Sequence, residues 1–195
     1  MGEWVIPPYG RDMFTRLLQY VSELPHPPVI FEVGSTRKKG NIAGDGYSTP
    51  LFAYIANEYG GEFYSIDIDP EATLVSTEIL IEYKMLTDKV HLITSDVIGY
   101  IKDSWKPLGR RIDILYLDGW EWIDPDKEAS AFSHFIVLRL LEPLLNPTAR
   151  VSIDDVSSDG GVVTGKGEIV IPYLLGKGYE IEWGGCACSL SRSKQ

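Results

Sequence analysis

Residues 29 to 50 read Val29-Ile30-Phe31-Glu32-Val33-Gly34-Ser35-Thr36-Arg37-Lys38-Lys39-Gly40-Asn41-Ile42-Ala43-Gly44-Asp45-Gly46-Tyr47-Ser48-Thr49-Pro50. The opening apolar run suits a buried parallel strand that ends at Glu32 and Gly34. A glycine-rich loop follows, and Ser48 or Thr49 can cap a helix whose first turn takes Pro50. A strand, a glycine loop and a helix start form a nucleotide-binding crevice, because glycines admit a ligand close to the backbone and helix amides favour anions. An ordinary, long strand-to-helix turn is the alternative reading.

The rest of the chain alternates strand and helix patterns. We expect helices near 11–24, 51–59, 72–83, 97–105, 132–140 and 168–175, with a glycine-rich loop before the last of them. We expect strands near 29–33, 63–67, 90–94, 112–117, 150–153, 179–183 and 186–190. This order predicts an α/β fold, a Rossmann-like doubly wound, mostly parallel seven-stranded sheet with helices on both faces and an antiparallel last strand.

Acidic residues stand where the predicted strands end. They are Glu32, Asp67, Asp96, Asp118 and the pair Asp154-Asp155. One acid at a strand end means little, because Asp is common in turns. Ligands of open α/β sheets bind beyond the carboxyl ends of the strands, so a whole series would line one crevice with carboxylates.

Composition limits the classes of protein that remain. The 195 residues suit one domain, and 44% hydrophobic with 24% charged residues are values of a globular protein. A net charge of -10 argues against nucleic acid as the main partner. No apolar run reaches membrane-spanning length and no signal-peptide pattern is present, so we expect a cytoplasmic protein without a membrane partner. Cys186 and Cys188 are expected to be packing residues in a reducing compartment.

Several of these motifs resemble those of class I S-adenosylmethionine-dependent methyltransferases, specifically the small metal-dependent O-methyltransferases of catechol or macrocin type. Glu32-Val33-Gly34-Ser35 and Gly46-Tyr47-Ser48-Thr49 resemble the two halves of the family's first motif, separated here by an insertion at Arg37 to Asp45. Three further stretches resemble family motifs. The second-strand motif is similar to Ser65-Ile66-Asp67-Ile68-Asp69-Pro70, and the fourth-strand motif to Leu117-Asp118-Gly119-Trp120. The fifth-strand motif is similar to Ser152-Ile153-Asp154-Asp155-Val156. The match runs from about Pro28 to the end of the sequence. We expect a single domain over 1–195, with an N-terminal arm and helix at 1–27 and a cofactor-binding core at 28–195.

The resemblance implies a site for S-adenosylmethionine. Asp67 would bind the ribose hydroxyls, and Asp96 with the amide of Val97 would bind adenine. The residues it implies at the cofactor are Glu32, Gly34, Ser35, Gly46, Tyr47, Ser48, Asp67, Ile68, Asp96, Val97, Asp118 and Trp120. Glu32 is expected to orient the loop, and Trp120 to pack on adenine or in the core.

The expected reaction is methyl transfer to a hydroxyl of a small organic acceptor. Asp118, Asp154 and Asp155 offer the oxygen ligands that Mg²⁺ or Ca²⁺ prefers, and such an ion would lower the pKa of a bound hydroxyl. Glu121 is a candidate general base, and Lys166 is another if burial lowers its pKa. The resemblance also predicts that EDTA abolishes turnover.

Other functions stay open at this point. A nicotinamide-dependent oxidoreductase would also use an acid after the second strand, but the Gly-x-Gly-x-x-Gly spacing is missing. A methyltransferase-like module that binds without turnover is a second alternative, because Arg37 to Asp45 interrupts the cofactor loop and Glu121 stands where related enzymes carry Lys or His. A serine hydrolase is disfavoured, since no histidine stands beside a nucleophile elbow. The acceptor and the oligomeric state cannot be read from the sequence.

Overall fold

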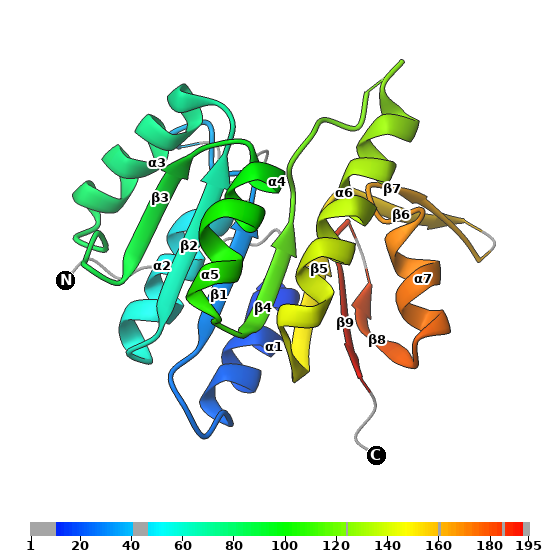
Figure 1. Cartoon of the computed structure of the whole chain (residues 1–195), viewed down its shortest axis with the longest axis horizontal. Helices are drawn as coiled ribbons and strands as arrows, with labels where there is room; N and C mark the ends of the chain where they lie inside the picture. The colour runs from blue at the N-terminus through cyan, green and yellow to red at the C-terminus, as the bar shows by residue number, and fades with distance from the viewer. Residues whose placement is uncertain (1–10, 41–46, 124, 160, 185, 193–195) are drawn as a thin grey trace.

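The computed structural model describes residues 11–40, 47–123, 125–159, 161–184 and 186–192. Its centre is a seven-stranded sheet of order β3-β2-β1-β4-β5-β9-β8. Figure 1 shows these strands side by side, from β3 at one edge of the sheet to β8 at the other. The strands of this sheet are β1 (Val29–Val33), β2 (Glu62–Asp67), β3 (Val90–Thr94), β4 (Ile112–Leu117), β5 (Leu145–Ile153), β8 (Tyr179–Gly184) and β9 (Cys188–Arg192). Only β9 runs against its neighbours, being antiparallel to both β5 and β8. The predicted sheet with an antiparallel last strand is confirmed.

Helices cover both faces of the sheet (Figure 1). They are α1 (Arg11–Ser22), α2 (Ser48–Glu58), α3 (Pro70–Glu82), α4 (Val97–Tyr100), the π-helical turn η1 (Ile101–Trp105), α5 (Lys106–Leu108), α6 (Lys127–Leu141), the 3₁₀ turn η2 (Glu142–Leu144) and α7 (Val170–Gly176). Side chains of a strand alternate between faces, so Ile30 packs with α1 and α2 whereas Phe31 and Val33 pack on the other face with Trp105. Two apolar layers therefore hold the sheet between the helices.

Helix α1 belongs to this packing rather than to a separate arm. Its residues Met13, Phe14, Leu17 and Val21 are buried against α2 and the sheet. The expected arm at residues 1–10 lies outside the described residues. No helix among the described residues is long and apolar enough to cross a membrane.

The start of α2 differs from the prediction that Ser48 or Thr49 caps it. The cap position is Tyr47, whose φ of 51° is left-handed and whose side chain makes no capping hydrogen bond. Ser48 and Thr49 lie inside the helix and are buried, and the Thr49 hydroxyl donates to Glu32 instead. The buried carboxyl group of Glu32 is costly without hydrogen-bond donors, and the Thr49 hydroxyl supplies one of them.

The second half of the chain shows two further differences. Strand β5 begins at Leu145 and includes Pro147, whereas the pattern predicted a start near Arg150. The segment predicted as a glycine loop is a hairpin of β6 (Val156–Asp159) and β7 (Val162–Gly165), which pair antiparallel. This hairpin lies beyond the end of β5 and leads directly into Lys166.

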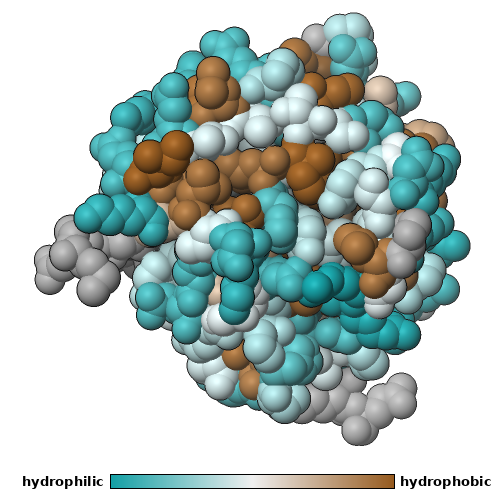
Figure 2. All heavy atoms as spheres, turned by 60° about the vertical axis from the view of Figure 1, so that its left-hand side comes forward, coloured by the Kyte–Doolittle hydropathy of each residue, from teal (hydrophilic) through white to brown (hydrophobic). Residues whose placement is uncertain are grey.

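The β3 edge of the molecule carries exposed apolar side chains. Leu74 and Ile81 of α3 are 58% and 60% exposed, and Ile68 between β2 and α3 is 73% exposed. Figure 2, which turns this side forward, shows apolar residues gathered among a largely polar surface.

Candidate functional site

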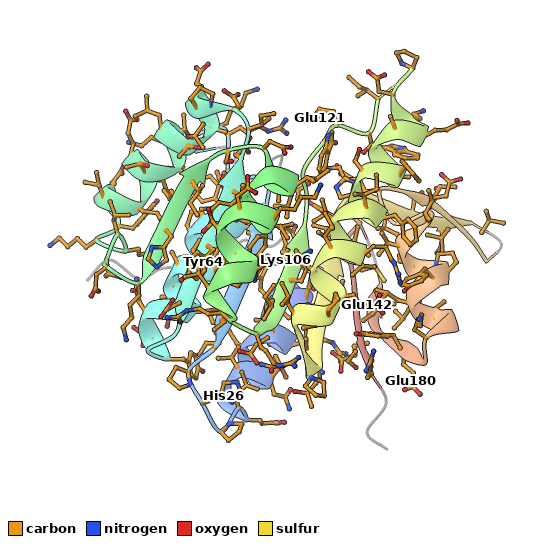
Figure 3. All side chains as sticks on the ribbon, viewed as in Figure 1. His26, Tyr64, Lys106, Glu121, Glu142 and Glu180 are labelled. Carbon is orange, nitrogen blue, oxygen red and sulfur yellow. The ribbon has the colours of Figure 1, made fainter. Side chains whose placement is uncertain are left out.

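A cavity of about 280 Å³ opens at the carboxyl ends of the parallel strands. Among the predicted site residues, those that line it are Gly34, Ser35, Asp67, Ile68, Asp96, Val97, Asp118, Trp120, Glu121, Asp154, Asp155 and Lys166. Glu32, Tyr47 and Ser48 do not line it, and Gly46 lies outside the described residues. Figure 3 shows Glu121 at this end of the sheet, whereas His26 lies at the opposite end. The topology thus gathers carboxylates from successive strands at one opening.

Asp67, at the end of β2, is fixed by two backbone amides. The amide of Ser35 donates to Oδ2 at 2.7 Å, and the amide of Asp69 donates to Oδ1 at 2.8 Å. An ionised carboxylate offers about four acceptor positions. Each oxygen therefore keeps one position for a ligand hydroxyl, and the carboxylate cannot rotate away from the cavity.

Gly34 allows the ends of β1 and β4 to approach each other. Its φ is +90°, and an added Cβ would lie 2.6 Å from the carbonyl oxygen of Asp118. Only glycine combines this φ with this contact. The floor of the cavity between the two strands is therefore backbone.

Asp96 caps the short helix α4. Its Oδ2 accepts a hydrogen bond of 2.7 Å from the amide of Gly99. The amide of Val97 begins the helix and so has no carbonyl of an earlier helical turn to bond to. The second oxygen of Asp96 and this amide form a donor and acceptor pair at the cavity edge.

Glu32 lies behind the cavity and holds its first loop. The carboxyl group is fully buried and accepts from the hydroxyls of Thr49 at 2.8 Å and Ser65 at 2.6 Å. Thr49 in turn accepts from the amide of Thr36 at 2.9 Å. Burial raises the pKa of Glu32 to about 8, against the opposing effect of the hydroxyls of Ser48, Ser65 and Thr49. Glu32 thereby connects β1, β2 and α2 and positions the loop that contains Ser35.

Lys166 lies between two carboxylates on the other side of the cavity. The residue is 3% exposed, and its Nζ lies 2.6 Å from Oδ1 of Asp118 and 2.8 Å from Oδ2 of Asp155. Burial disfavours the charged amine, but the charges of Asp118 and Asp155 outweigh it, so the pKa of Lys166 is raised. The sequence interpretation of Lys166 as a general base required a lowered pKa, and the structure contradicts that condition. Lys166 is a fixed ammonium ion.

Asp154 is the most deeply buried of the three aspartates after β4 and β5. It is 8% exposed, and its Oδ1 has no hydrogen-bond partner among the described residues. Burial first, and then the charges of Asp118 and Asp155, raise the pKa of Asp154 to about 7. Asp154 is therefore a buried carboxyl group whose ionisation its own burial and the neighbouring carboxylates oppose.

The predicted divalent cation does not fit these residues. Two of its expected ligands, Asp118 and Asp155, point at the Lys166 ammonium, which would repel a second cation at the same place. Within the described ranges, no group of three His, Cys, Asp or Glu side chains could hold a metal ion. The three aspartates do come together as the sequence suggested, but a lysine fills the position between them.

Glu121 and Arg37 form an ion pair across the cavity mouth. Both side chains are about half exposed, at 50% and 53%, so solvent screens the pair. Arg37 comes from the interrupted first loop, and Lys39 of the same loop pairs with Glu82 on α3. Glu121, the candidate base, is thus held by a guanidinium at the rim.

Trp120 stands at the rim in a left-handed conformation, with φ of 51° and 40% exposure. Its ring meets the ring of His134 edge to face, with centroids 5.4 Å apart. His134 is fully buried, and burial lowers its pKa to about 4. The indole therefore packs against a buried imidazole while it lines the cavity.

Six residues of the cavity wall are not among the predicted site residues. They are Val33, Arg37, Ile66, Asp69, Ser95 and Gly119. Each of them is within two positions of a predicted site residue. Their position near a strand end could therefore have indicated that they line the cavity.

No protein-family model matches the sequence, and no curated protein matches it. Solved structures do match it in fold. An O-methyltransferase from Bacillus cereus in complex with SAH superposes with a TM-score of 0.64 at 14% identity, over 98% of this chain and 84% of that one. A Staphylococcus aureus protein provisionally assigned as a caffeoyl-CoA O-methyltransferase gives 0.63 at 16%, over 96% and 85%.

A third matching structure has a name that refers to a different methyl acceptor, ribosomal RNA. A Clostridium thermocellum protein provisionally assigned as an rRNA methylase gives a TM-score of 0.59 at 16% identity, over 97% of this chain and 100% of that one. The chain thus has the fold of class I S-adenosylmethionine-dependent methyltransferases, as its motifs suggested. At these identities the likeness concerns the fold, and the acceptor has to be argued from the site.

Proposed function

We infer that this protein transfers the methyl group of S-adenosylmethionine to a hydroxyl of a small organic acceptor. The observation that carries this inference is the carboxylate of Asp67, held by the amides of Ser35 and Asp69 with acceptor positions left over. A ribose offers two neighbouring hydroxyl donors, which match the two oxygens of a fixed carboxylate. Asp96 and the amide of Val97 would take the adenine edge, since one accepts and the other donates.

The charge of the cavity supports this cofactor. Its wall contains the acids Asp67, Asp69, Asp96, Asp118, Glu121, Asp154 and Asp155 and the two cations Arg37 and Lys166. S-Adenosylmethionine has a sulfonium, an ammonium and a carboxylate, so its net charge is positive and the acidic wall attracts it. The demethylated product lacks the sulfonium and is held less strongly by charge.

The same charge argues against the alternatives. A nicotinamide dinucleotide has a pyrophosphate, which this wall would repel. A nucleic acid would meet the same repulsion, and the chain as a whole is acidic with a net charge of -10. A small neutral or cationic acceptor is the partner that we propose.

The parts of the wall have separate tasks in this proposal. Gly34 and Ser35 bring backbone close to the methionine portion of the cofactor, which glycine permits. Trp120 and Glu121 stand at the rim, where an acceptor with a ring would enter and stack. Methyl transfer from a sulfonium needs mainly alignment of the acceptor oxygen, which a preorganised wall supplies.

The methyl transfer proposed here uses no divalent cation. Such an ion would supply Lewis-acid activation of the hydroxyl. The described aspartates face an ammonium instead, so proton removal and charge stabilisation have to come from protein groups.

Isothermal titration of the purified chain with S-adenosylhomocysteine, S-adenosylmethionine and NAD tests the proposal. We expect both adenosyl ligands to bind and NAD to give no heat. Binding of NAD alone would overturn the assignment. Incubation with S-adenosylmethionine and a panel of hydroxyl acceptors, followed by mass spectrometry of products, then separates an enzyme from a module that binds without turnover.

A further inference from the structure

Lys166 is an unusual residue for a cavity wall because its charge is almost completely removed from water. Its side chain is 4% exposed, and its two closest partners are the carboxylates of Asp118 and Asp155. Removing a charged amine from water is costly unless opposite charges surround it. The arrangement is therefore a built-in ion triad and not a chance contact of a long side chain.

The backbone fixes Lys166 as firmly as the charges do. Its amide donates to the carbonyl oxygen of Asp155 at 3.1 Å, so the end of the hairpin is attached to the end of β5. Gly165, which precedes it, has φ of +93°, and a Cβ there would lie 1.9 Å from the same carbonyl oxygen. A glycine is therefore required at position 165, where the hairpin ends and Lys166 follows.

The place that Lys166 fills is the place that a shared divalent ion would need. Oδ1 of Asp118 and Oδ2 of Asp155 both point at Nζ, from 2.6 Å and 2.8 Å. An ion bridging the same two oxygens would lie about 2.1 to 2.5 Å from each, within the volume of the ammonium group. The ammonium and the ion therefore exclude each other.

The Lys166 ammonium keeps one weakly used donor. An ammonium has three N–H donors. Asp118 and Asp155 accept from two of them, at 2.6 Å and 2.8 Å, and the carbonyl oxygen of Asp118 accepts a long hydrogen bond of 3.4 Å from the same ammonium. This long hydrogen bond is the weakest of the three, so a hydroxyl in the cavity can replace it as the acceptor.

We propose that Lys166 is the internal cation of the acceptor site: its ammonium takes the place of a divalent ion between Asp118 and Asp155 and donates a hydrogen bond to the hydroxyl that receives the methyl group. The proposal rests on the methyltransferase function inferred above and narrows its substrate class to hydroxyl compounds that need no metal chelation. A single alcohol or phenol suffices, whereas a metal-bound acceptor needs a second oxygen to reach the ion.

Metal binding tests the internal cation directly, without knowledge of the acceptor. Titration of Mn²⁺ into the wild-type chain, followed by the electron paramagnetic resonance signal of free Mn²⁺, should show no site at millimolar concentrations. The variant Lys166→Met leaves Asp118 and Asp155 facing each other without a cation. We expect it to melt at a lower temperature, to gain a Mn²⁺ site at least tenfold tighter than any in the wild type, and to recover thermal stability with Mn²⁺ or Mg²⁺.

A matched control is Lys102→Met, which removes an exposed lysine of η1 and should leave metal binding and melting temperature unchanged. If Lys166→Met does not fold, the double variant Lys166→Met/Asp155→Asn removes the repulsion and should fold without gaining a metal site. Wild-type binding of Mn²⁺ that Asp118→Asn abolishes would overturn the proposal, and so would a folded Lys166→Met without a new site. Failure to bind S-adenosylhomocysteine would instead refute the proposed function and leave the metal result standing.

Discussion

Nζ of Lys166 lies 2.6 Å from Oδ1 of Asp118, although 48 positions separate the two residues in the chain. Asp118 directly follows β4 and is part of a motif that can be read from the sequence. Lys166 follows a hairpin that the sequence pattern did not reveal. The pair changes the chemistry of the site, because carboxylates that were expected to hold a metal ion hold an ammonium instead.

Asp67→Asn should weaken binding of S-adenosylhomocysteine. The substitution keeps the shape of the side chain but replaces one acceptor oxygen with a donor and removes the charge. Hydrogen bonds to charged groups are worth about 1.5 to 3 kcal/mol, so the dissociation constant should rise about tenfold to a hundredfold. Isothermal titration measures it, with Asp88→Asn in the exposed turn before β3 as the control. Equal affinities of Asp67→Asn and wild type would remove Asp67 from the site.

Glu32→Gln should stabilise the protein at alkaline pH. The folded pKa of Glu32, about 8, is above its ordinary value of 4.5, so the folded state binds this proton more tightly than the unfolded state. The contribution of Glu32 to stability is complete below pH 4.5 and is lost as the pH rises through 8. At about 1.4 kcal/mol per pKa unit, the loss between pH 5 and pH 8.5 is up to about 4 kcal/mol, and glutamine does not undergo it.

Urea unfolding of wild type and Glu32→Gln at both pH values measures this difference. Asp154, whose pKa is also raised, titrates in the same direction, so some decline with pH should persist in the variant. Parallel declines in the two proteins would show that Glu32 is ionised in the fold at neutral pH.

His134→Leu should make the protein less sensitive to acid. The pKa of His134 falls from 6.5 to about 4 on folding, because burial disfavours the imidazolium ion. Its contribution to stability is therefore complete above pH 6.5 and is lost as the pH falls toward 4. Between pH 7 and pH 4.5 the wild type should lose about 2 kcal/mol more than the variant, which urea unfolding at the two pH values detects. A steeper loss in the variant would contradict this account.

Gly165→Ala should destabilise the protein more than Gly161→Ala. Both glycines have positive φ, at +93° and +85°, so both substitutions meet the same kind of backbone strain. At Gly165 the new Cβ would also lie 1.9 Å from the carbonyl oxygen of Asp155, whereas at Gly161 nothing lies within 4 Å. Strain alone costs about 1 to 2 kcal/mol, and the clash at Gly165 should add to it.

Thermal unfolding of the two variants tests this comparison, since Gly161→Ala serves as the control for strain. The Gly165→Ala variant should also bind Mn²⁺ more readily, if displacement of the hairpin withdraws Lys166 from Asp118 and Asp155. Similar melting temperatures for the two variants would mean that the hairpin end is free to shift.

The acids at the strand ends could be predicted because their cause is local. A strand such as Val90–Thr94 is marked by its own apolar residues, and Asp96 follows it within two positions. Topology then places every parallel strand end at one edge of the sheet. The positions of Asp67, Asp96 and Asp118 around the cavity follow from these two rules.

Other predictions failed where a distant partner outweighed the local rule. Thr49 satisfies the ordinary pattern of a helix cap, but the buried Glu32 at 2.8 Å takes its hydroxyl. This partner cannot be recognised from the sequence around Thr49, because the contact joins elements that fold from separate segments. The hairpin has a different cause: Val156 pairs with Gly165 only nine positions away, and its glycines were interpreted as a loop instead of a turn between two strands.

The sequence by itself determined the doubly wound sheet, the glycine at position 34 and the series of acids, since alternating apolar runs and turn residues act within a few positions. Only the tertiary structure decided that Lys166 stands between Asp118 and Asp155 and that Asp154 is buried. The physical reason is that a lysine in a glycine-rich segment has no preferred direction. It becomes a buried cation only when the folded hairpin places it among carboxylates whose combined charge outweighs its loss of water.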